Sequence, residues 1–497
     1  MSKFNPIAVV WEITMGCNMR CKHCGSSCQG GLPDELTTEE ALDLCDQLAS
    51  LGVKFVNLSG GEPLLRNDWD KIATRLMSLG VQSHIISNGW LIDDEMAKRA
   101  YNAGIKVFAI SLDGLQNTHD YMRCDGSFDS VMQSLRILKN NGVNTAIITT
   151  INKRNLPELT EMKDILKEHG IGAWQLQIAT PMGSFHGHRD ELMIEPHQVN
   201  DIINLAYKVK DEIKVCLGDC VGYYSNKEHK IRENFFGTKD AIWVGCAAGK
   251  YSLGILHNGD ITGCNSIRSA DFIEGNIRNK SLKEIWESGF AWNREFSRES
   301  LSGMCIDCQY ASYCLGGCPN MRLCLNGAIQ NENTYCAYHN MITSEFNEIS
   351  IDSIGFDEIV QILEKALKAK NYNLAIMLAG AYMDKNKDLT DAQTLHLLNY
   401  LHYAYFRVGR YEKSRELCER ALAINNSDSY ALHGLAISLF YAGDIKGSLN
   451  ALNALEQIDT PKFKETLDDL CIASKSIHKY DDLKDLRSLA ERHGVAI

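Results

Sequence analysis

The most informative segment of the chain is Cys17-Asn18-Met19-Arg20-Cys21-Lys22-His23-Cys24, in which three cysteines have C-x3-C-x2-C spacing. It directly follows the apolar, β-branched run from Ile7 to Thr14, which predicts a strand. Three thiolates are one short of the four that structural zinc requires, but they suit a [4Fe-4S] cube with one iron left open. A zinc site closed by Cys28 is the alternative, and it gives no role to the Gly60–Pro63 loop after the second predicted strand.

Around this loop, the first part of the chain repeats a unit of an apolar run, a turn, an amphipathic segment and a glycine that ends the helix. The pattern predicts six strands: Ile7–Thr14, Val53–Ser59, Val81–Ser87, Ile105–Leu112, Val143–Ile151 and Ile171–Ala179. Strands that alternate with helices form parallel sheets with right-handed crossovers. The expected fold class is therefore α/β, a partial (β/α)6 TIM-like barrel.

Chemically unusual loops follow the predicted strands at their carboxyl ends. After the cysteine loop come Ser59-Gly60-Gly61-Glu62-Pro63, Ser87-Asn88-Gly89 and Ser111-Leu112-Asp113-Gly114. Parallel barrels place their chemistry on such loops, so we expect one face of the barrel to collect them all.

These motifs resemble the radical S-adenosylmethionine (AdoMet) enzymes. Their cysteine loop has this spacing with an aromatic-type residue before the third cysteine, a place that His23 occupies, and Gly60, Gly61, Glu62 and Pro63 match their Gly-Gly-Glu segment. The resemblance implies that Cys17, Cys21 and Cys24 hold the catalytic cluster and that the Gly-Gly-Glu segment receives the methionine amino group. One electron from the cluster then cleaves AdoMet to a 5′-deoxyadenosyl radical, which abstracts hydrogen from unactivated C–H bonds.

Further AdoMet contacts follow from the same resemblance. Asn88, Ser111 and Asp113 stand where relatives contact the ribose and carboxylate of AdoMet, and Arg123 stands where a carboxylate-pairing arginine often lies. Capping of turns is the alternative role for such Asn, Ser and Asp side chains. Gln177, with its strand neighbour Gln175, faces either adenine or substrate, or forms a hydrogen-bonded pair inside the barrel.

A second group of cysteines follows the predicted barrel and resembles the SPASM extension of radical AdoMet enzymes that modify peptides and proteins. The resemblance implies two auxiliary [4Fe-4S] clusters, a distal one held by Cys305, Cys308, Cys314 and Cys336, and a proximal one held by Cys246, Cys264 and Cys318. The proximal set is one thiolate short: Cys216, Cys220 or Cys324 supplies it, or the iron stays open. A pair of zinc knuckles is the alternative for the whole region.

Helix-forming residues dominate the last part of the chain, where a degenerate repeat appears. Gly409, Tyr411, Ser414 and Ala421 recur thirty-four residues later as Gly443, Ile445, Ser448 and Leu455, and a looser copy contains Tyr372 and Ala375. The pattern resembles a tetratricopeptide (TPR) array, whose concave face usually binds peptides or proteins; a packing appendage without a ligand is the alternative. We therefore expect three domains: a radical AdoMet barrel at 1–210, a SPASM domain at 211–345 and a TPR-like helical domain at 346–497.

Composition narrows the environment in which the protein works. A formal charge of −12 and a pI near 5.7 argue against nucleic acid as a partner. The sequence shows neither a signal peptide nor the ~20-residue apolar run that spans a bilayer, so we expect a cytoplasmic protein without a membrane partner. In a reducing compartment, 18 cysteines point to metal or cluster ligation rather than disulfides.

These features together predict a radical AdoMet/SPASM maturase of a ribosomally made precursor peptide. A thioether or other intramolecular cross-link is the expected product, because bond closure at a carbon radical releases an electron that an auxiliary cluster can accept. The alternatives are oxidation of a protein residue as in sulfatase maturation, processing of a cofactor-precursor peptide, epimerisation, and a non-catalytic cluster scaffold. In the sulfatase-type relatives an aspartate follows the residue equivalent to Cys264, and here Asn265 takes its place. By resemblance the electron donor is a flavodoxin or ferredoxin.

Overall fold

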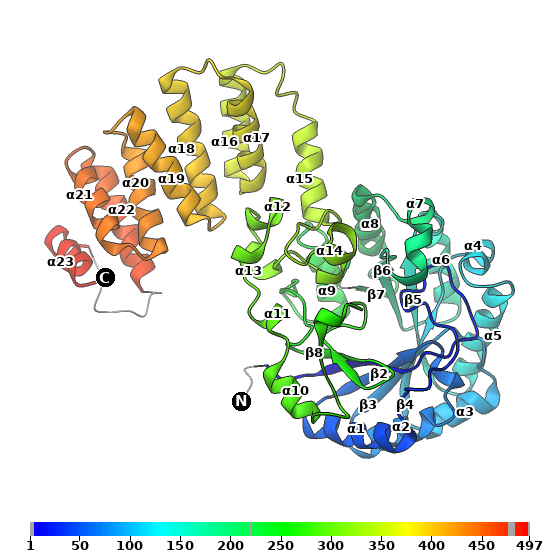
Figure 1. Cartoon of the computed structure of the whole chain (residues 1–497). Coiled ribbons are helices and arrows are strands. Elements are labelled where there is room, and N and C mark those ends of the chain that lie inside the picture. The colour runs from blue at the N-terminus through cyan, green and yellow to red at the C-terminus, as the bar shows by residue number, and fades with distance from the viewer. Residues whose placement is uncertain (1–3, 219, 476–482, 496–497) are drawn as a thin grey trace. The chain divides into compact units, whose positions relative to one another are not determined.

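The structure is a computed structural model that describes residues 4–218, 220–475 and 483–495 (Figure 1). The chain divides into two compact units. The first comprises Met1–Ile306 and Ser312–Asn340, and the second comprises Asp307–Ala311 and Met341–Ile497. Strands and helices make up the first unit, whereas the second unit is helical.

Six parallel strands with intervening helices confirm the predicted α/β fold. The strands are β1 (Ala8–Thr14), β2 (Phe55–Gly60), β3 (Gln82–Ser87), β4 (Ile105–Ser111), β5 (Asn144–Ile151) and β6 (Ala173–Ile178), and each pairs in parallel with the next. The helices between them are α1 (Thr38–Ser50), α2 (Trp69–Ser78), α3 (Asp94–Asn102), α4 (Gln116–Met122), α5 (Ser127–Asn140) and α6 (Leu159–Glu168). Large apolar side chains such as Trp11, Trp69 and Trp174 fill the core.

Several strands begin later than the apolar pattern predicts, because the preceding helix uses the first backbone N–H. After α2, Gly80 adopts a left-handed φ of 77°, and Val81 N donates to Leu76 O at 2.9 Å. This bond closes the helix in a Schellman-type motif. The same type of bond follows α5, where Val143 N donates to Leu138 O.

The sheet continues beyond the six predicted strands. Within the described residues its order is β10-β9-β8-β1-β2-β3-β4-β5-β6-β7. Four short strands extend it: β7 (Lys214–Leu217), β8 (Ser252–Ile255), β9 (Asp260–Thr262) and β10 (Ile273–Asn276). Strand β8 pairs in parallel with β1, so the hairpin that carries Cys264 lies next to the strand that precedes the three-cysteine loop.

Short helices complete the first unit. They are α7 (Arg189–Leu192), α8 (Val199–Val209), α9 (Glu228–Phe236), α10 (Leu282–Ser288), α11 (Ala291–Arg294), α12 (Gly303–Ile306), α13 (Ala311–Cys314) and α14 (Pro319–Asn326).

The second unit confirms the predicted helical C-terminal segment. After α15 (Ala337–Asn347), which begins in the first unit, come α16 (Phe356–Lys368), α17 (Tyr372–Lys385), α18 (Asp391–Arg407), α19 (Tyr411–Ile424), α20 (Ser429–Ala442), α21 (Ile445–Glu456), α22 (Thr460–Ser474) and α23 (Lys484–His493). The thirty-four-residue repeat has a structural counterpart. Ser414 Oγ donates to His402 O at 2.8 Å, and the equivalent Ser448 Oγ donates to Ala436 O at 2.7 Å. In both repeats, therefore, a serine hydroxyl joins the second helix of the pair to the first in the same way.

Among the helices that the structure describes, none combines the length and the hydropathy needed to cross a membrane.

Candidate active site

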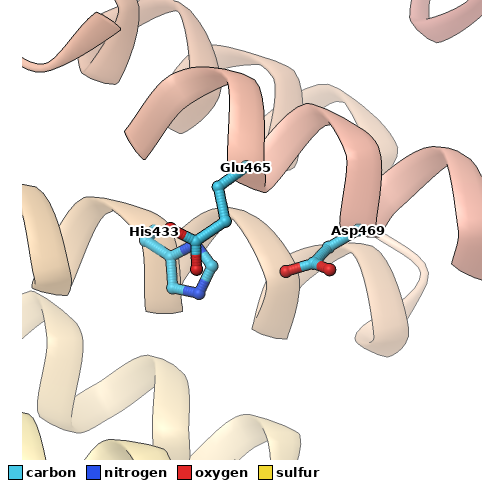
Figure 2. Close-up of side chains that lie close together, drawn as sticks. All are labelled: His433, Glu465 and Asp469. Carbon is cyan, nitrogen blue, oxygen red and sulfur yellow. The ribbon is translucent and has the colours of Figure 1, made fainter. Parts of the chain in front are cut away.

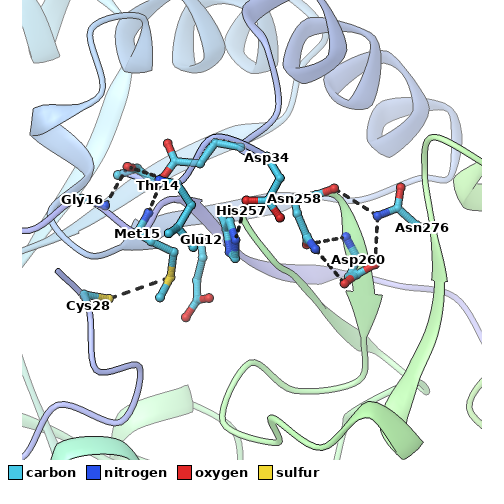
Figure 3. Close-up of polar contacts among 12 residues, drawn as sticks. Glu12, Thr14, Met15, Gly16, Cys28, Asp34, His257, Asn258, Asp260 and Asn276 are labelled. Atoms are coloured by element: carbon cyan, nitrogen blue, oxygen red, sulfur yellow. Dashed lines mark hydrogen bonds and ion pairs between the residues drawn. The ribbon is translucent and has the colours of Figure 1, made fainter. Parts of the chain in front are cut away.

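The three-cysteine loop leaves β1 through a set of hydrogen bonds that fix its direction. Glu35 Oε1 accepts from Met15 N at 2.7 Å and from Thr14 Oγ1 at 3.0 Å, and Thr14 Oγ1 accepts from Gly16 N at 3.0 Å. Figure 3 shows this turn with Cys28 beside Met15, their sulfur atoms 4.0 Å apart. The same loop approaches the β8–β9 hairpin, where His257 faces Asp34 in Figure 3. Both the start and the end of the loop are thus held by the surrounding chain.

The loop brings its cysteines close enough for their charges to interact. Burial, followed by the negative charges of neighbouring groups, raises the pKa of the Cys17 thiol, and burial raises the pKa of Cys21 to about 11. A hydrogen bond from Cys28 lowers the pKa of Cys24 to about 5. Half-buried thiolates that repel one another need a positive partner to coexist, and iron supplies one. The donor set therefore fits a cluster.

The spacing of potential ligand atoms does not fit zinc held by cysteines. Tetrahedral Zn²⁺ with Zn–S bonds of about 2.3 Å places its sulfur ligands within about 4 Å of one another. Across the described part of the chain, the structure brings three or more histidine, cysteine or carboxylate ligand atoms within 4.8 Å of one another at His433, Glu465 and Asp469, and at no set of cysteines. The wider cube of a [4Fe-4S] cluster suits the cysteine loop better.

The Gly60–Pro63 segment packs directly against the backbone of the cysteine loop. Gly61 N donates to Thr14 O and Glu62 N donates to Gly16 O, each at 2.8 Å. A Cβ at Gly60, whose φ is 139°, would lie 2.2 Å from Thr14 O, and one at Gly61 would lie 2.1 Å from Gly16 O. The two glycines are therefore required for contact between two loops, before any ligand is considered.

Glu62 is completely buried, and backbone and side-chain donors of this chain surround its carboxylate. It accepts from Ser87 Oγ at 2.9 Å, from Asn88 N at 2.8 Å and from Leu64 N at 3.2 Å, just before the short helical turn Pro63–Leu65. Burial outweighs these donors and raises its pKa to about 7. Glu62 thus joins the loops after β2 and β3 and titrates near neutral pH.

The remaining predicted AdoMet contacts lie at the ends of neighbouring strands. Asn88 Nδ2 donates to Asn18 Oδ1 at 2.7 Å, which links the loop after β3 to the cysteine loop. Ser111 ends β4 and is half-buried. Gln177 Oε1 accepts from Gln175 Nε2 at 3.2 Å, and Gln177 Nε2 donates to Thr150 Oγ1 at 3.1 Å. The glutamines therefore form the pair inside the barrel, and contact with adenine stays a prediction.

Arg123 forms a buried ion pair beside the cysteine loop. Its Nη2 lies 2.7 Å from Asp113 Oδ2, with both side chains nearly inaccessible, and its Nη1 donates to Cys21 Sγ at 3.8 Å. His23 Nε2 lies 3.1 Å from the same Asp113 oxygen. Burial raises the pKa of Asp113, but Arg123 and then His23 outweigh burial and hold the pKa below its usual range. The arginine therefore supplies positive charge to Cys21, a predicted cluster ligand, and its pairing with the AdoMet carboxylate stays a prediction.

Sequence reasoning missed a second ion pair at the barrel mouth, in which the carboxylate is buried. Glu12, only 4% exposed, pairs with Arg268, and Ser26 Oγ donates to the same carboxylate at 3.1 Å. Arg268 lies just after Cys264, so this pair joins β1, the cysteine loop and the SPASM segment. The break of the apolar run at Glu12 was the available signal, but its partner is 256 residues away.

Cys220 lies close enough to the predicted proximal cysteine set for its charge to act on Cys318. Burial raises the pKa of Cys318 well above its usual value, and the thiolates of Cys220, Cys246 and Cys264 raise it further. Of the other two candidates, Cys216 lies on β7 with its sulfur 3.9 Å from Leu217 O, and Cys324 donates to Asn320 Oδ1 at 3.4 Å on α14. The charge of Cys220 on Cys318 favours Cys220 as the fourth ligand, which stays a prediction.

Three members of the predicted distal set, Cys305, Cys314 and Cys336, belong to the first unit. Within the first unit, the Arg322 side chain is buried and interacts with the charges of Cys305, Cys318 and Cys314. This guanidinium provides positive charge near members of both predicted cluster sets.

Comparison with protein families identifies both cysteine regions. Residues 11–166 match the Radical SAM superfamily model, and residues 246–309 match the SPASM model, described as an iron-sulfur cluster-binding domain. The matched ranges include the three-cysteine loop and four of the seven predicted auxiliary ligands, Cys246, Cys264, Cys305 and Cys308.

The matches to curated relatives cover most of each relative's own length. The chain is 31% identical over 345 residues to the AdoMet-dependent heme synthase of Methanosarcina barkeri (strain Fusaro / DSM 804), covering 67% of this chain and 97% of the relative. It is 28% identical over 319 residues to the mycofactocin maturase MftC of Mycolicibacterium smegmatis, covering 63% of this chain and 78% of the relative.

Solved structures share the fold. Streptococcus suis SuiB bound to S-adenosylmethionine superposes with a TM-score of 0.53 at 18% identity, over 66% of this chain and 76% of SuiB. SuiB bound to its precursor peptide SuiA superposes with a TM-score of 0.52 at 16% identity, over 66% and 75%. With a half-buried three-cysteine loop, an adjoining Gly-Gly-Glu segment and matches along both cysteine regions, this chain belongs to the radical SAM superfamily and is an AdoMet-dependent iron-sulfur enzyme with a SPASM domain.

Proposed function

We propose that this enzyme modifies a ribosomally made precursor peptide and closes an intramolecular cross-link, a thioether foremost. The peptide class is supported by the similarity to the maturase MftC and by the helical unit, since stacked helical repeats commonly bind peptides. The product class rests on one observation, that Cys220, Cys246 and Cys264 are close enough to Cys318 for their charges to raise the pKa of its thiol. Four thiolates would hold a cluster with no open iron, which can accept an electron but has no site for a substrate ligand.

The atoms and electrons of cross-link formation balance when one AdoMet is consumed for each bond formed. When bound, the first cluster and AdoMet supply a radical that removes a hydrogen atom from a substrate C–H bond. Attack by a substrate thiol on the resulting carbon radical forms the C–S bond and releases one proton and one electron. Over both steps the substrate loses two hydrogens, and AdoMet is converted to methionine and 5′-deoxyadenosine.

The chain's own residues hold the reacting groups in this proposal. Cys17, Cys21 and Cys24 bind the catalytic cluster, and Arg123 offsets the charge of Cys21. Ionised Glu62 receives the methionine ammonium, while Asn88, Ser111 and Asp113 line the ribose and carboxylate end. Cys305, Cys308, Cys314 and Cys336 hold the distal auxiliary cluster. A flavodoxin- or ferredoxin-type protein delivers the electron.

Oxidation of a protein residue through a base after Cys264 is less well supported. Asn265 Nδ2 donates to Ile255 O at 3.2 Å, and a Cβ at Gly254 would overlap Asn265 Oδ1. The asparagine side chain is thus packed inside the β8–β9 hairpin, and an amide accepts no proton at neutral pH.

The second candidate function is modification of a tetrapyrrole. It is favoured by the relatives named heme synthase, of which the Methanosarcina barkeri protein is 31% identical and matched over 97% of its length.

Product analysis of the cluster-loaded enzyme distinguishes the candidates. The protein, reduced with dithionite and given AdoMet, is incubated with the short peptides encoded beside its gene or with iron-porphyrin carboxylates. We expect 5′-deoxyadenosine and a peptide lighter by two hydrogens, with its cysteine protected from alkylation. Conversion of the porphyrin with unchanged peptides would establish the second candidate, and deuterium uptake from D2O without mass loss in H2O would establish epimerisation. The Cys17→Ala/Cys21→Ala/Cys24→Ala variant, which keeps the auxiliary cysteines, is the control that should form no 5′-deoxyadenosine.

A further inference from the structure

Three potential metal ligands converge in the helical unit, far along the sequence from every cluster cysteine. His433 lies on α20, and Glu465 and Asp469 lie four residues apart on α22 (Figure 2). One ligand atom from each side chain lies within 4.8 Å of the other two. Residues four apart share one face of a helix, so α22 presents both carboxylates to the histidine on the neighbouring helix.

A hydrogen-bond relay fixes the tautomer of His433. Thr466 Oγ1 donates its only proton to Lys462 O at 2.6 Å. His433 Nδ1 lies 2.7 Å from the same hydroxyl oxygen, which must therefore accept, so Nδ1 carries the imidazole hydrogen. Nε2 then carries a lone pair. Metal-binding histidines are typically held by a hydrogen bond at the nitrogen that does not bind the metal, and Thr466 provides that bond here.

The imidazole is kept neutral by its surroundings. Burial, followed by the charge of Lys462, lowers the pKa of His433 to about 4. A protonated ring is thus not available to neutralise the two acidic side chains beside it, and the neutral ring is the form that binds metals.

Lys462 supplies positive charge beside the two carboxylates. Burial and the negative charge of Glu465 raise the pKa of Asp469. Lys462 Nζ lies 3.0 Å from Glu465, but that carboxylate is 57% exposed. Exposed Lys–Glu pairs of this type contribute little free energy, so a bound cation can replace the lysine at Glu465 at small cost.

We propose that His433 Nε2, Glu465 and Asp469 form a binding site for a divalent transition-metal cation, with Zn²⁺ as the best match. One imidazole nitrogen and two carboxylate oxygens suit Zn²⁺, which takes three protein ligands and a water in open sites. The site links α20 to α22 through a metal, and it is independent of the clusters and of the proposed substrate.

Zinc binding to the full-length, cluster-loaded protein tests this site. After anaerobic equilibrium dialysis against ZnCl2, zinc and iron are counted by mass spectrometry. The wild-type protein should hold about one zinc more than Asp469→Asn, with equal iron in both. Asp468→Asn is the matched control, because Asp468 is the adjacent exposed aspartate on the same helix, and it should bind zinc like the wild type. Equal zinc in wild type and Asp469→Asn, or loss of zinc in Asp468→Asn as well, would overturn the proposal.

A second variant tests the relay itself. Thr466→Val keeps the shape of the side chain but removes the acceptor for Nδ1, and we expect zinc affinity to fall by about 10- to 100-fold. Zinc should also raise the thermal unfolding midpoint of the wild-type helical unit but not that of Asp469→Asn. Unchanged zinc affinity in Thr466→Val, or a wild-type midpoint that zinc does not move, would contradict the assignment.

Discussion

The affinity for AdoMet should depend on pH through Glu62. The proposed partner of the AdoMet ammonium is the ionised carboxylate, and burial raises the pKa of that carboxyl to about 7. Binding to the ionised form therefore strengthens as pH rises through 7 and levels off above it. With this pKa, about one carboxyl in eleven is ionised at pH 6 and about ten in eleven at pH 8, so AdoMet should bind roughly tenfold more weakly at pH 6, or about 1.4 kcal/mol.

The same pKa predicts an opposite effect on folding without AdoMet. A carboxyl whose pKa is higher in the folded than in the unfolded protein binds its proton more tightly when folded. Its stabilising effect is therefore complete below the unfolded value, 4.5, and is lost as pH rises to about 7. The loss amounts to roughly 3 kcal/mol for the two to three pKa units between these values.

Equilibrium dialysis of AdoMet with anaerobic, cluster-loaded protein from pH 5.5 to 8.5 measures the first effect. Glu62→Gln should bind AdoMet more weakly at pH 8, by roughly 1.5–3 kcal/mol for a lost charge-assisted bond, and should show no titration near 7. His23→Gln is the control, because it removes the imidazole beside Asp113 and leaves Glu62 in place. The reasoning is refuted if the wild-type affinity is flat across this range, or if the profile disappears in His23→Gln but persists in Glu62→Gln.

Three further predictions concern the surrounding structure. Arg123→Met should lower the free energy of unfolding by about 3–5 kcal/mol, because it leaves a buried carboxylate unpaired; in urea denaturation the double variant with Asp113→Asn should lose less than the sum of the single losses. Cys220→Ser should reduce iron content by about four per chain, whereas Cys324→Ser should keep it, and equal iron in both would reject the four-cysteine set. Ser448→Ala should cost the helical unit about 1 kcal/mol through the lost hydroxyl bond, measured by calorimetry.

Local patterns were sufficient for the fold class and for the cluster chemistry. Strand periodicity and helix-ending glycines depend on neighbouring residues, so the six βα units were predicted with errors of a few residues at strand starts such as Val81, where the helix takes the first N–H. Cysteine spacing is equally local, because the ligands in one loop reach one cluster whatever the rest of the chain does.

The partners of the site residues depend on the order of the strands, which local patterns do not encode. The parallel pairing of β1 with β8 brings Arg268 to Glu12 across 256 positions, and the sheet places Arg123 beside Cys21. The sequence marks Glu62 as a ligand carboxylate, and the neighbouring strand end adds donors from Ser87 and Asn88 that no local pattern predicts. The amino-acid sequence thus determined which chemical groups are present and how each segment folds locally. Only the tertiary structure decided which of these groups meet, since burial and charge pairing arise from contacts between segments far apart in the chain.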